Sequence, residues 1–249
     1  MRLCVFGSEG RMGRAIREEA GDSVVACYDT VPPGTPPGVP LAGHVDVMLD
    51  FSLPEAWDDL DRLLEPLDCA LVTGTTGLGP GHREMLDFWA SRRAVFAASN
   101  MSLGVHVLGR LLGTAARMLA SAGDTGGDFS LEVVELHHGG KVDSPSGTAL
   151  KLVEIWEEVN GPATRTLGRS GPVGPRRLDE VGIHSLRGGD VAGEHQLHLL
   201  GPGERLVLAH SATGRRTFAL GALRAAEFVK DMGPGLYSMD DLLGGDAGP

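Results

Sequence analysis

The sequence predicts an α/β protein in which a Rossmann-like, doubly wound parallel sheet is joined to a second, α+β domain with an open mixed sheet. Two features of the first hundred residues predict the parallel sheet. The apolar run Arg2–Phe6 leads into the glycine-rich segment GSEGRMG and then into a helical pattern. The same order of apolar run and helix-like segment recurs as far as residue 98. Repeated βα units form parallel sheets, and such sheets bind ligands beyond the carboxyl ends of their strands.

The remaining elements of the first domain are placed by the same alternation. Further short apolar runs predict strands, and two helical patterns lie between them, the first opened by Pro54, a residue that suits the start of a helix. Strands are expected at Ser23–Tyr28, Val45–Phe51, Cys69–Thr73 and Ala94–Ala98, and helices at Pro54–Leu64 and Gly81–Ser91. The segment 31–40 contains five prolines in ten residues and is therefore expected to be a surface loop.

The rest of the chain predicts a second sheet and three further helices. A helix at Ser102–Leu119 is expected to bury a stripe that runs from Leu103 through Val107 and Leu111 to Met118. Short apolar or alternating runs between glycine turns predict strands that form one sheet. These strands are expected at Phe129–Leu136, Ile183–Leu186, Gln196–Leu200 and Leu206–Ser211, and the other helices at Thr148–Val159 and Thr217–Val229.

The composition excludes several classes of protein. With 22 basic and 33 acidic residues the chain has a net charge of −11, which disfavours a general nucleic-acid-binding role. No apolar run approaches the roughly 20 residues that span a bilayer. Cys4, Cys27 and Cys69 each lie in an apolar run and are odd in number, which predicts buried, reduced thiols in a cytoplasmic protein. The sequence also starts without an apolar stretch of signal-peptide type.

The segment Gly7–Gly13 is the first candidate ligand site. Its glycines would let the backbone approach a pyrophosphate, and the start of the following helix would supply N–H groups. Asp29 follows Gly13 by 16 residues, close to the spacing expected for a carboxylate that binds ribose hydroxyls. The pattern is GxxGxxG rather than GxGxxG, and glycines that merely tighten a turn are the alternative interpretation. Two later strand ends, Gly74–Gly77 and Ala98–Ser102, are rich in small hydrogen-bonding groups, which favours nucleotide binding.

A polar cluster after residue 136 is the second candidate site. The segment HHGGKVDSPSGTAL places His137, His138 and Lys141 close to the turn Ser146-Gly147-Thr148, and Lys141 is one of only three lysines. Lysine and protonated histidine neutralise carboxylates, histidine donates protons near neutral pH, and a helix start offers N–H groups to an anion. The alternative is a polar loop with a capped helix. No metal is expected, because adjacent histidines project differently and no carboxylate lies at ligand spacing.

These motifs together resemble the 4-hydroxy-tetrahydrodipicolinate reductase family, formerly called dihydrodipicolinate reductases. The matching segments run in family order along nearly the whole chain, and the histidine-lysine-PSGT block is the most specific of them. They are GSEGRMG, DFSLPEA, GTTG, NMSLGV, ELHHGGKVDSPSGTAL, RGGDVAGEH and TFALGALRAAEFV. The resemblance implies an enzyme of the diaminopimelate pathway of lysine biosynthesis, in which hydride passes from NAD(P)H to the substrate ring with loss of water and protonation.

The resemblance also implies roles for individual residues. His137 matches the family's proton donor or acceptor and Lys141 its proton donor, so which of the two delivers the proton stays open. Substrate contacts are implied for His138, Lys141, Gly147 and Thr148, and cofactor contacts for Gly7, Ser8, Glu9, Gly10, Arg11, Met12, Asp29, Gly74, Thr75, Thr76, Ala98, Ser99, Asn100 and Met101. Arg187 and His195 could reach the site, but turn-stabilising hydrogen bonds explain them equally well.

The family pattern further implies the domain organisation and the partners. A dinucleotide-binding domain is expected at residues 1–101, completed by 217–249, and a substrate-binding and tetramerisation domain at 102–216. We expect a homotetramer that takes a small dicarboxylate substrate and binds neither nucleic acid nor membrane. Two other functions suit the same fold: another imine or amino-acid dehydrogenase, and a catalytically silent nucleotide-sensing protein, which should have lost the general acid or the lysine.

The expected cofactor is NADH, with weaker use of NADPH. Asp29 should accept the ribose hydroxyls and repel a 2′-phosphate. The segment from Thr30 to Pro40 supplies no arginine or lysine that could hold such a phosphate, whereas Arg11 leaves some use of NADPH open.

Overall fold

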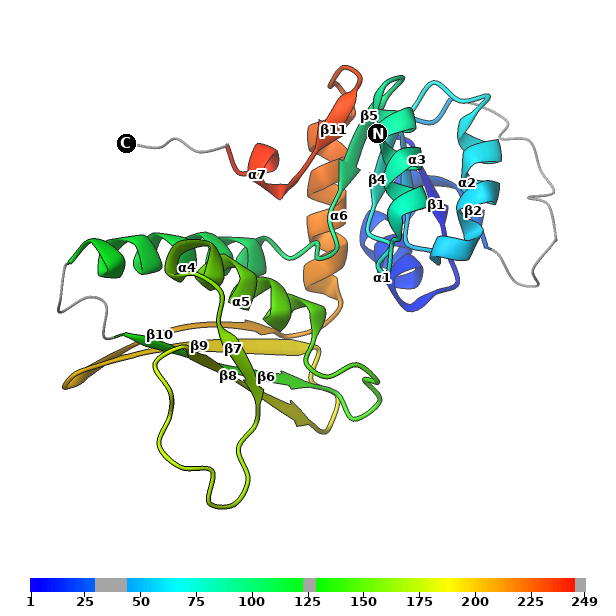
Figure 1. Cartoon of the computed structure of the whole chain (residues 1–249). Helices are drawn as coiled ribbons and strands as arrows, with labels where there is room; N and C mark the ends of the chain where they lie inside the picture. The colour runs from blue at the N-terminus through cyan, green and yellow to red at the C-terminus, as the bar shows by residue number, and fades with distance from the viewer. Residues whose placement is uncertain (30–43, 123–128, 245–249) are drawn as a thin grey trace. The chain divides into compact units, whose positions relative to one another are not determined.

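A computed structural model describes residues 1–29, 44–122 and 129–244 of the chain (Figure 1). The chain divides into two compact units, the first formed by residues 1–102 with 215–249 and the second by residues 103–214. The boundaries expected from the sequence, after residues 101 and 216, lie close to this division. The proline-rich segment expected to be a surface loop lies outside the described residues.

The first unit is built on a six-stranded parallel sheet, sheet A. Its strands are β1 (Leu3–Phe6), β2 (Val24–Tyr28), β3 (Val47–Asp50), β4 (Ala70–Thr73), β5 (Ala94–Ala97) and β11 (Gly235–Tyr237). They lie in the order β11-β5-β4-β3-β1-β2, and every adjacent pair is parallel. The chain passes from β1 to β2 on one side and returns to β3 on the other, so the carboxyl ends of β1 and β3 form a topological switch point. The predicted doubly wound parallel sheet is confirmed.

Helices cover both faces of sheet A. Helices α2 (Trp57–Leu64) and α3 (Pro80–Ala90) bury Trp57, Leu60 and Trp89 against alternate strand residues. On the other face α1 (Arg11–Ala20) packs against α6 (Arg216–Val229), and α6 also contacts β3, β4 and β5. Two short 3-10 helices at Gly21–Ser23 and Pro54–Ala56 and the short helix α7 (Met239–Leu242) complete the described part of the unit.

The second unit is built on a five-stranded mixed sheet, sheet B. Its strands are β6 (Ser130–His137), β7 (Thr164–Leu167), β8 (Glu180–Arg187), β9 (Gly193–Gly201) and β10 (Glu204–Ala212), in the order β10-β9-β6-β8-β7. β8 is parallel to both β6 and β7, whereas β9 is antiparallel to its two neighbours. Helices α4 (Leu103–Ser121) and α5 (Gly147–Asn160) lie on one face of the sheet (Figure 1). Leu131, Val133 and Leu197 fill the core between sheet and helices.

The predicted buried stripe of α4 is wrong. Val107, Leu111 and Met118 are 43%, 51% and 68% exposed, and the buried residues are Leu108, Gly109, Leu112, Gly113 and Ala116. Added Cβ atoms on the two glycines would lie 3.0 and 3.4 Å from the side chain of Ile155 on α5. The two helices therefore approach through small residues, which an apolar periodicity does not count as a buried face.

Two further expectations are corrected by the structure. Cys27 is exposed, because β2 is the edge strand of sheet A and the side chain projects beside α1; Cys4 and Cys69 are buried and all three thiols are free. The sequence also gave no signal for β7 and β11. Among the helices that the structure describes, none is long and apolar enough to cross a membrane.

Candidate functional site

The glycine turn after β1 is closely packed. The N–H groups of Gly7 and Ser8 both donate to the carbonyl oxygen of Tyr28, at 2.9 and 3.0 Å. Gly7 has a φ of +80°, and a Cβ atom there would lie 2.6 Å from the carbonyl oxygen of Phe51. A Cβ atom on Gly13 would lie 2.2 Å from the carbonyl oxygen of Gly7. Only glycine fits these two positions, so α1 starts directly against the end of β1.

The start of α1 is open to a ligand. Glu9, Gly10 and Arg11 are exposed and Met12 is half-buried, and the helix has no side-chain cap. The N-cap residue, Gly10, has no side chain that could accept from the first N–H groups, which suits an anionic group at this end of the helix. Asp29, directly after β2, accepts a hydrogen bond of 2.6 Å from the N–H of Glu9. The structure thus brings the predicted ribose-binding carboxylate against the predicted phosphate turn.

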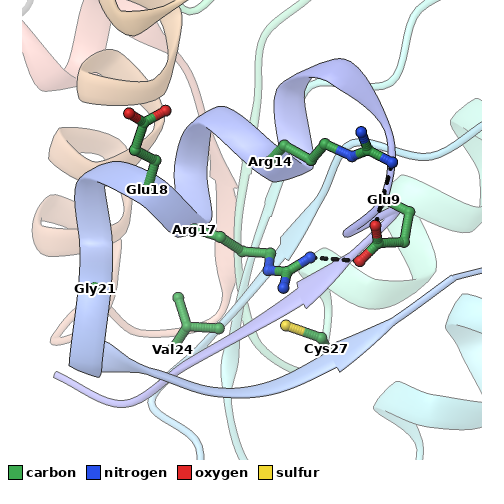
Figure 2. A pocket seen from close by; sticks show the side chains of 7 residues that line it. All are labelled: Glu9, Arg14, Arg17, Glu18, Gly21, Val24 and Cys27. Atoms are coloured by element: carbon green, nitrogen blue, oxygen red, sulfur yellow. Dashed lines mark hydrogen bonds and ion pairs between the residues drawn. The ribbon is translucent and has the colours of Figure 1, made fainter.

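An open hollow lies beside this turn, between α1 and β2 (Figure 2). The carboxylate of Glu9 points into it and is bound by Arg17 at 2.5 Å and by Arg14 at 3.3 Å. The exposed Cys27 of β2 also lines the hollow. The two arginines are therefore paired with a carboxylate of the glycine turn rather than presented to an incoming anion.

A fully buried carboxylate fixes the loop after β4. Asp50, the last residue of β3, accepts hydrogen bonds from the hydroxyls of Thr73 and Thr75 at 2.7 and 2.8 Å and from the indole N–H of Trp57 at 3.2 Å. The hydroxyl and N–H of Ser52 donate to its other oxygen at 2.5 and 3.1 Å. Burial raises the pKa of Asp50, although the hydrogen bonds from Ser52 and the two threonines act in the opposite direction.

The residues of the GTTG loop differ in how accessible they are to a ligand. Thr75 is buried with its hydroxyl on Asp50, whereas Thr76 is exposed. Gly74 lies against the ring of Phe51, where a Cβ atom would come within 2.2 Å of a ring carbon. The backbone of this loop and Thr76, rather than the hydroxyl of Thr75, are thus available to a ligand.

The segment after β5 lies at the same edge of sheet A. The N–H of Ala98 donates to the carbonyl of Thr73 at 3.1 Å, and the side chain of Asn100 accepts from the N–H of Ser102 at 2.9 Å. Ser99 is exposed, whereas Met101 is 2% exposed. All predicted cofactor residues of the first unit therefore follow the carboxyl ends of β1, β2, β4 and β5, at one edge of sheet A, and this arrangement fits a dinucleotide.

The second candidate site is organised by a carboxylate that the sequence did not single out. Glu135 is completely buried on β6 and accepts two hydrogen bonds from the guanidinium of Arg187, at 2.7 and 2.8 Å. It also accepts from Nδ1–H of His137 at 2.6 Å and from the N–H of Ser146 at 3.2 Å. Burial raises the pKa of Glu135, but hydrogen bonds from Arg187, Ser185 and His137 outweigh burial and lower it to about 2. Glu135 is therefore ionised at neutral pH.

His137 is mostly enclosed, with 11% of its side chain exposed. Burial lowers its pKa, the Glu135 carboxylate opposes this effect, and the positive charges of Lys141 and Arg187 lower the pKa further. The net shift is downward, so the imidazole is neutral at pH 7. Because Nδ1 donates to Glu135, the neutral ring has an unprotonated Nε2 that can exchange a proton with a ligand.

His195 joins the same cluster from β9. It is 3% exposed, its ring centroid lies 5.4 Å from that of His137, and its Nε2 lies 3.1 Å from the hydroxyl of Ser146. Burial lowers the pKa of His195 to about 4, and the positive charge of Lys141 acts in the same direction. Its Nδ1 has no hydrogen-bond partner among the described residues. His195 is therefore a neutral part of the wall beside His137.

The remaining predicted substrate residues surround this core. Lys141 donates to a carboxylate oxygen of Asp143 at 2.7 Å and keeps 19% of its side chain exposed. His138 is half-buried, and its N–H donates to the carbonyl of Val191 at 2.8 Å. Gly147 is exposed at the first position of α5, next to the half-buried Thr148.

Ser146 caps the helix that Gly147 begins, because its hydroxyl accepts from the N–H of Ala149 at 3.1 Å. The cluster thus combines an open helix start, an amine and a neutral histidine with a buried counter-charge, which suits a carboxylate ligand that also needs a proton. Among the described residues, no group of three histidine, cysteine, aspartate or glutamate side chains is arranged to hold a metal ion.

Sequence reasoning missed Glu135, named Ser146 only as part of the anion-binding turn, and left Arg187 and His195 undecided. One signal was present: Leu131 and Val133 mark the buried face of β6, and Glu135 continues the same alternation with a charged residue. A charge at a buried strand position needs a partner. The identity of that partner depends on strand register, which places Arg187 beside His137 and His195 beside Glu135.

Comparisons with known proteins match both units. The family model described as dihydrodipicolinate reductase, N-terminus, matches residues 39–101, and the model described as dihydrodipicolinate reductase, C-terminus, matches residues 104–243. Relatives named 4-hydroxy-tetrahydrodipicolinate reductase include that of Akkermansia muciniphila, 42% identical over 97% of both chains. The protein of that name from Wolinella succinogenes is 39% identical over 98% of this chain and 99% of its own.

Solved structures support the same fold. The dihydrodipicolinate reductase of Paenisporosarcina, bound to dipicolinate, aligns with a TM-score of 0.70 and 23% identity over 96% of this chain and 97% of its own. The myo-inositol dehydrogenase of Lactobacillus casei, in complex with NAD(H) and myo-inositol, aligns with a TM-score of 0.54 and 14% identity over 97% of this chain and 90% of its own.

Proposed function

The chain belongs to the dihydrodipicolinate reductase family, and we propose that it reduces 4-hydroxy-tetrahydrodipicolinate to tetrahydrodipicolinate with NAD(P)H. This reaction belongs to the diaminopimelate route of lysine biosynthesis. The single observation that carries the proposal within the structure is the cluster on sheet B. There His137 and the N–H of Ser146, which precedes α5, both bind Glu135, and Lys141 pairs with Asp143 on the connecting loop. Such a cluster suits a dicarboxylate that must also be protonated.

The nicotinamide cofactor supplies the hydride, and the chain supplies the binding and proton-transfer groups. In this proposal the turn Gly7–Met12, Asp29, and the loops at Gly74–Thr76 and Ala98–Met101 hold the cofactor. The N–H of Gly147 and the hydroxyl of Thr148 bind one substrate carboxylate. The overall reaction consumes one proton and releases one water molecule together with the oxidised cofactor.

His137 and Lys141 are the proposed proton donors, with His138 and Lys141 binding the substrate. His137 is neutral in the free protein because its pKa is lowered. A bound dianion would raise the pKa of His137, since nearby negative charge favours the protonated ring. Substrate binding would in this way charge the group that then delivers the proton.

A coupled assay tests this function. Freshly made product of the preceding synthase is supplied, and oxidation of NADH is followed by absorbance. The parent protein should turn over, and Lys141→Ala and His137→Gln should each lose about 10²- to 10⁴-fold in kcat, the usual contribution of a general acid. Lys151→Ala is the matched control, because Lys151 is an exposed lysine of α5 that pairs with Glu154. No turnover by the parent, or full turnover by both site variants, would contradict the proposal.

The proposal includes a preference for NADH over NADPH. Asp29 is the carboxylate expected at the ribose, and the neighbouring Glu9 carboxylate pairs with Arg14 and Arg17, so these arginines are not left for a phosphate. Both features disfavour a 2′-phosphate by charge, although Arg11 is exposed at the start of α1. A higher kcat/KM with NADPH than with NADH would rule out this preference.

The proposal also includes a cytoplasmic homotetramer assembled through sheet B. The face that α4 and α5 leave uncovered carries the exposed apolar side chains of Leu186, Leu200 and Val207. Such side chains on one sheet face are typical of an interface between subunits. Light scattering coupled to gel filtration should give four times the mass of one chain, 26.1 kDa.

A further inference from the structure

The buried carboxylate of Glu135 connects the two halves of the second site. One of its oxygens accepts from Nδ1–H of His137 at 2.6 Å, and the other accepts from the N–H of Ser146 at 3.2 Å. Both oxygens also accept from Arg187, whose guanidinium donates in addition to the carbonyl of Asp143 at 2.8 Å. A single side chain with no exposed surface thus touches the candidate proton donor and the residue that begins the anion-binding turn.

We propose that Glu135 is the positioning residue of this site: it fixes His137 as the Nδ1–H tautomer and anchors the turn that starts α5. The kinetic part of this inference rests on the proposed function, whereas the tautomer does not. An ionised carboxylate only accepts hydrogen bonds, so the ring nitrogen that faces Glu135 must carry the proton. The other ring nitrogen then remains the acceptor or donor for a ligand.

The packing around His137 leaves little freedom for the opposite orientation. A Cβ atom on Gly193 would lie 3.1 Å from Nε2 of His137, so the backbone of β9 closes one side of the ring. The charged and titratable groups that face the ring are Glu135 on its own strand, Lys141 on the following loop, Arg187 on β8 and His195 on β9. Of these only Glu135 is negative, so only Glu135 favours the protonated ring.

Arg187 keeps the carboxylate of Glu135 ionised and in a fixed position. The paired hydrogen bonds of 2.7 and 2.8 Å hold Glu135 ionised in the interior, where an unpaired charge would be costly. Because these bonds engage both oxygens, the carboxylate is held in place before any ligand arrives. The ring of His137 is therefore oriented in the free protein.

Glu135→Gln in the full-length protein tests the inference, with nitrogen NMR of histidine-labelled protein as the direct readout. The parent should show His137 with Nδ1 protonated and Nε2 unprotonated at a pH above the histidine pKa. In the variant the amide can donate to Nδ1, and the Nε2–H tautomer should become the main form. If the variant does not fold, the parent spectrum alone decides, because an Nε2–H tautomer of His137 there would overturn the inference.

The matched control is Glu132→Gln. Glu132 lies on the same strand but on the opposite face of sheet B, where it binds Arg169 at 2.8 and 2.9 Å and His184 at 2.8 Å. The variant Glu132→Gln loses the same charge, and it alters hydrogen bonds to an arginine and a histidine as Glu135→Gln does, but it does not touch His137. An equal change of the His137 tautomer in both variants would mean a general loss of structure and would overturn the role of Glu135.

The kinetics add a readout that a purely structural role would not move. In Glu135→Gln, kcat/KM should fall about 10- to 100-fold, the range found when the carboxylate that orients a metal-bound histidine is removed. The limb of the pH profile that reports His137 should move to lower pH by about 1 unit or more, because loss of a nearby negative charge disfavours the protonated ring. An unmoved limb together with a parent-like tautomer would overturn the proposal. A parent without reductase turnover would reject the proposed function, and the NMR comparison would still decide the role of Glu135.

Discussion

Acidification should weaken the second unit by an amount set by two carboxylates of β6. Glu132 and Glu135 lie on opposite faces of sheet B and share no partner. Burial raises the pKa of each carboxyl group. Hydrogen bonds outweigh burial, chiefly from Arg169 to Glu132 and from Arg187 to Glu135, and lower both pKa values from 4.5 to about 2.

The magnitude follows from proton linkage. A carboxylate with a lowered pKa in the folded protein stabilises the fold fully above the unfolded pKa, 4.5, and loses this contribution as the pH falls toward about 2. At pH 3 the unfolded chain binds a proton that the folded chain does not, and each site then contributes about 2 kcal/mol less to the free energy of unfolding than at pH 7. Below pH 2 the loss per site approaches about 3 kcal/mol.

Urea unfolding at pH 7, 5, 4 and 3 measures this effect, with far-ultraviolet circular dichroism as the probe. Other carboxyl groups also titrate, so the decisive quantity is the stability difference between the parent and each of Glu132→Gln and Glu135→Gln. For either variant this difference should shrink by about 2 kcal/mol between pH 7 and pH 3, most of it below pH 5. A difference that stays constant across this range would show that the pKa of the carboxyl group is not lowered by its partners, and the electrostatic account would be wrong.

Three further substitutions, with Gly81→Ala as a control, probe the surroundings of the two sites. Gly13→Ala should lower the free energy of unfolding by about 1–3 kcal/mol and weaken NADH binding in a fluorescence titration, because its Cβ atom would lie 2.2 Å from a backbone oxygen. The control Gly81→Ala in α3, where a Cβ atom has open space, should leave the free energy of unfolding unchanged or raise it slightly. Gly193→Ala should lower kcat/KM by about tenfold by displacing His137, with little change in KM for NADH. Ser146→Ala should remove the cap of α5 and lower the free energy of unfolding by about 1 kcal/mol in urea titrations, and an unchanged value would show that the cap adds nothing.

The fold was predictable because its signals are local. Each strand of sheet A except β11 is a short apolar run, and the glycine turn marks the start of α1. Two strands had no apolar pattern that could predict them. β7, Thr164–Leu167, is an edge strand with mostly exposed residues, and β11 has only three residues. The buried face of α4 was misplaced because Gly109 and Gly113 carry no apolar side chain, although they form the contact with α5.

The candidate site was predictable only in part, because half of it depends on distant partners. His137 and Lys141 stand out by residue type within one loop. Arg187 lies 52 residues from Glu135 in sequence, and the two meet because β8 pairs with β6 in a particular register. His195 similarly lies opposite Glu135 across the antiparallel pair of β6 and β9. A shift of the register by one residue would turn these side chains to the other face, and no local pattern fixes that choice.

A buried carboxylate at the end of a strand organises a functional loop in both units, but the two carboxylates differ in electrostatics. Among the described residues, the groups that donate to Asp50 are hydroxyl, indole and backbone groups and none is a cation, and burial raises its pKa. Glu135 is paired with Arg187, and its pKa is lowered. The difference suits the ligands proposed for each unit. The first unit needs no cation beside Asp50 to bind a pyrophosphate, because the start of α1 supplies a positive electrostatic field. A dicarboxylate site needs fixed cations. Because Arg187 neutralises the negative charge of Glu135, that charge orients His137 without weakening the attraction of Lys141 for the dicarboxylate.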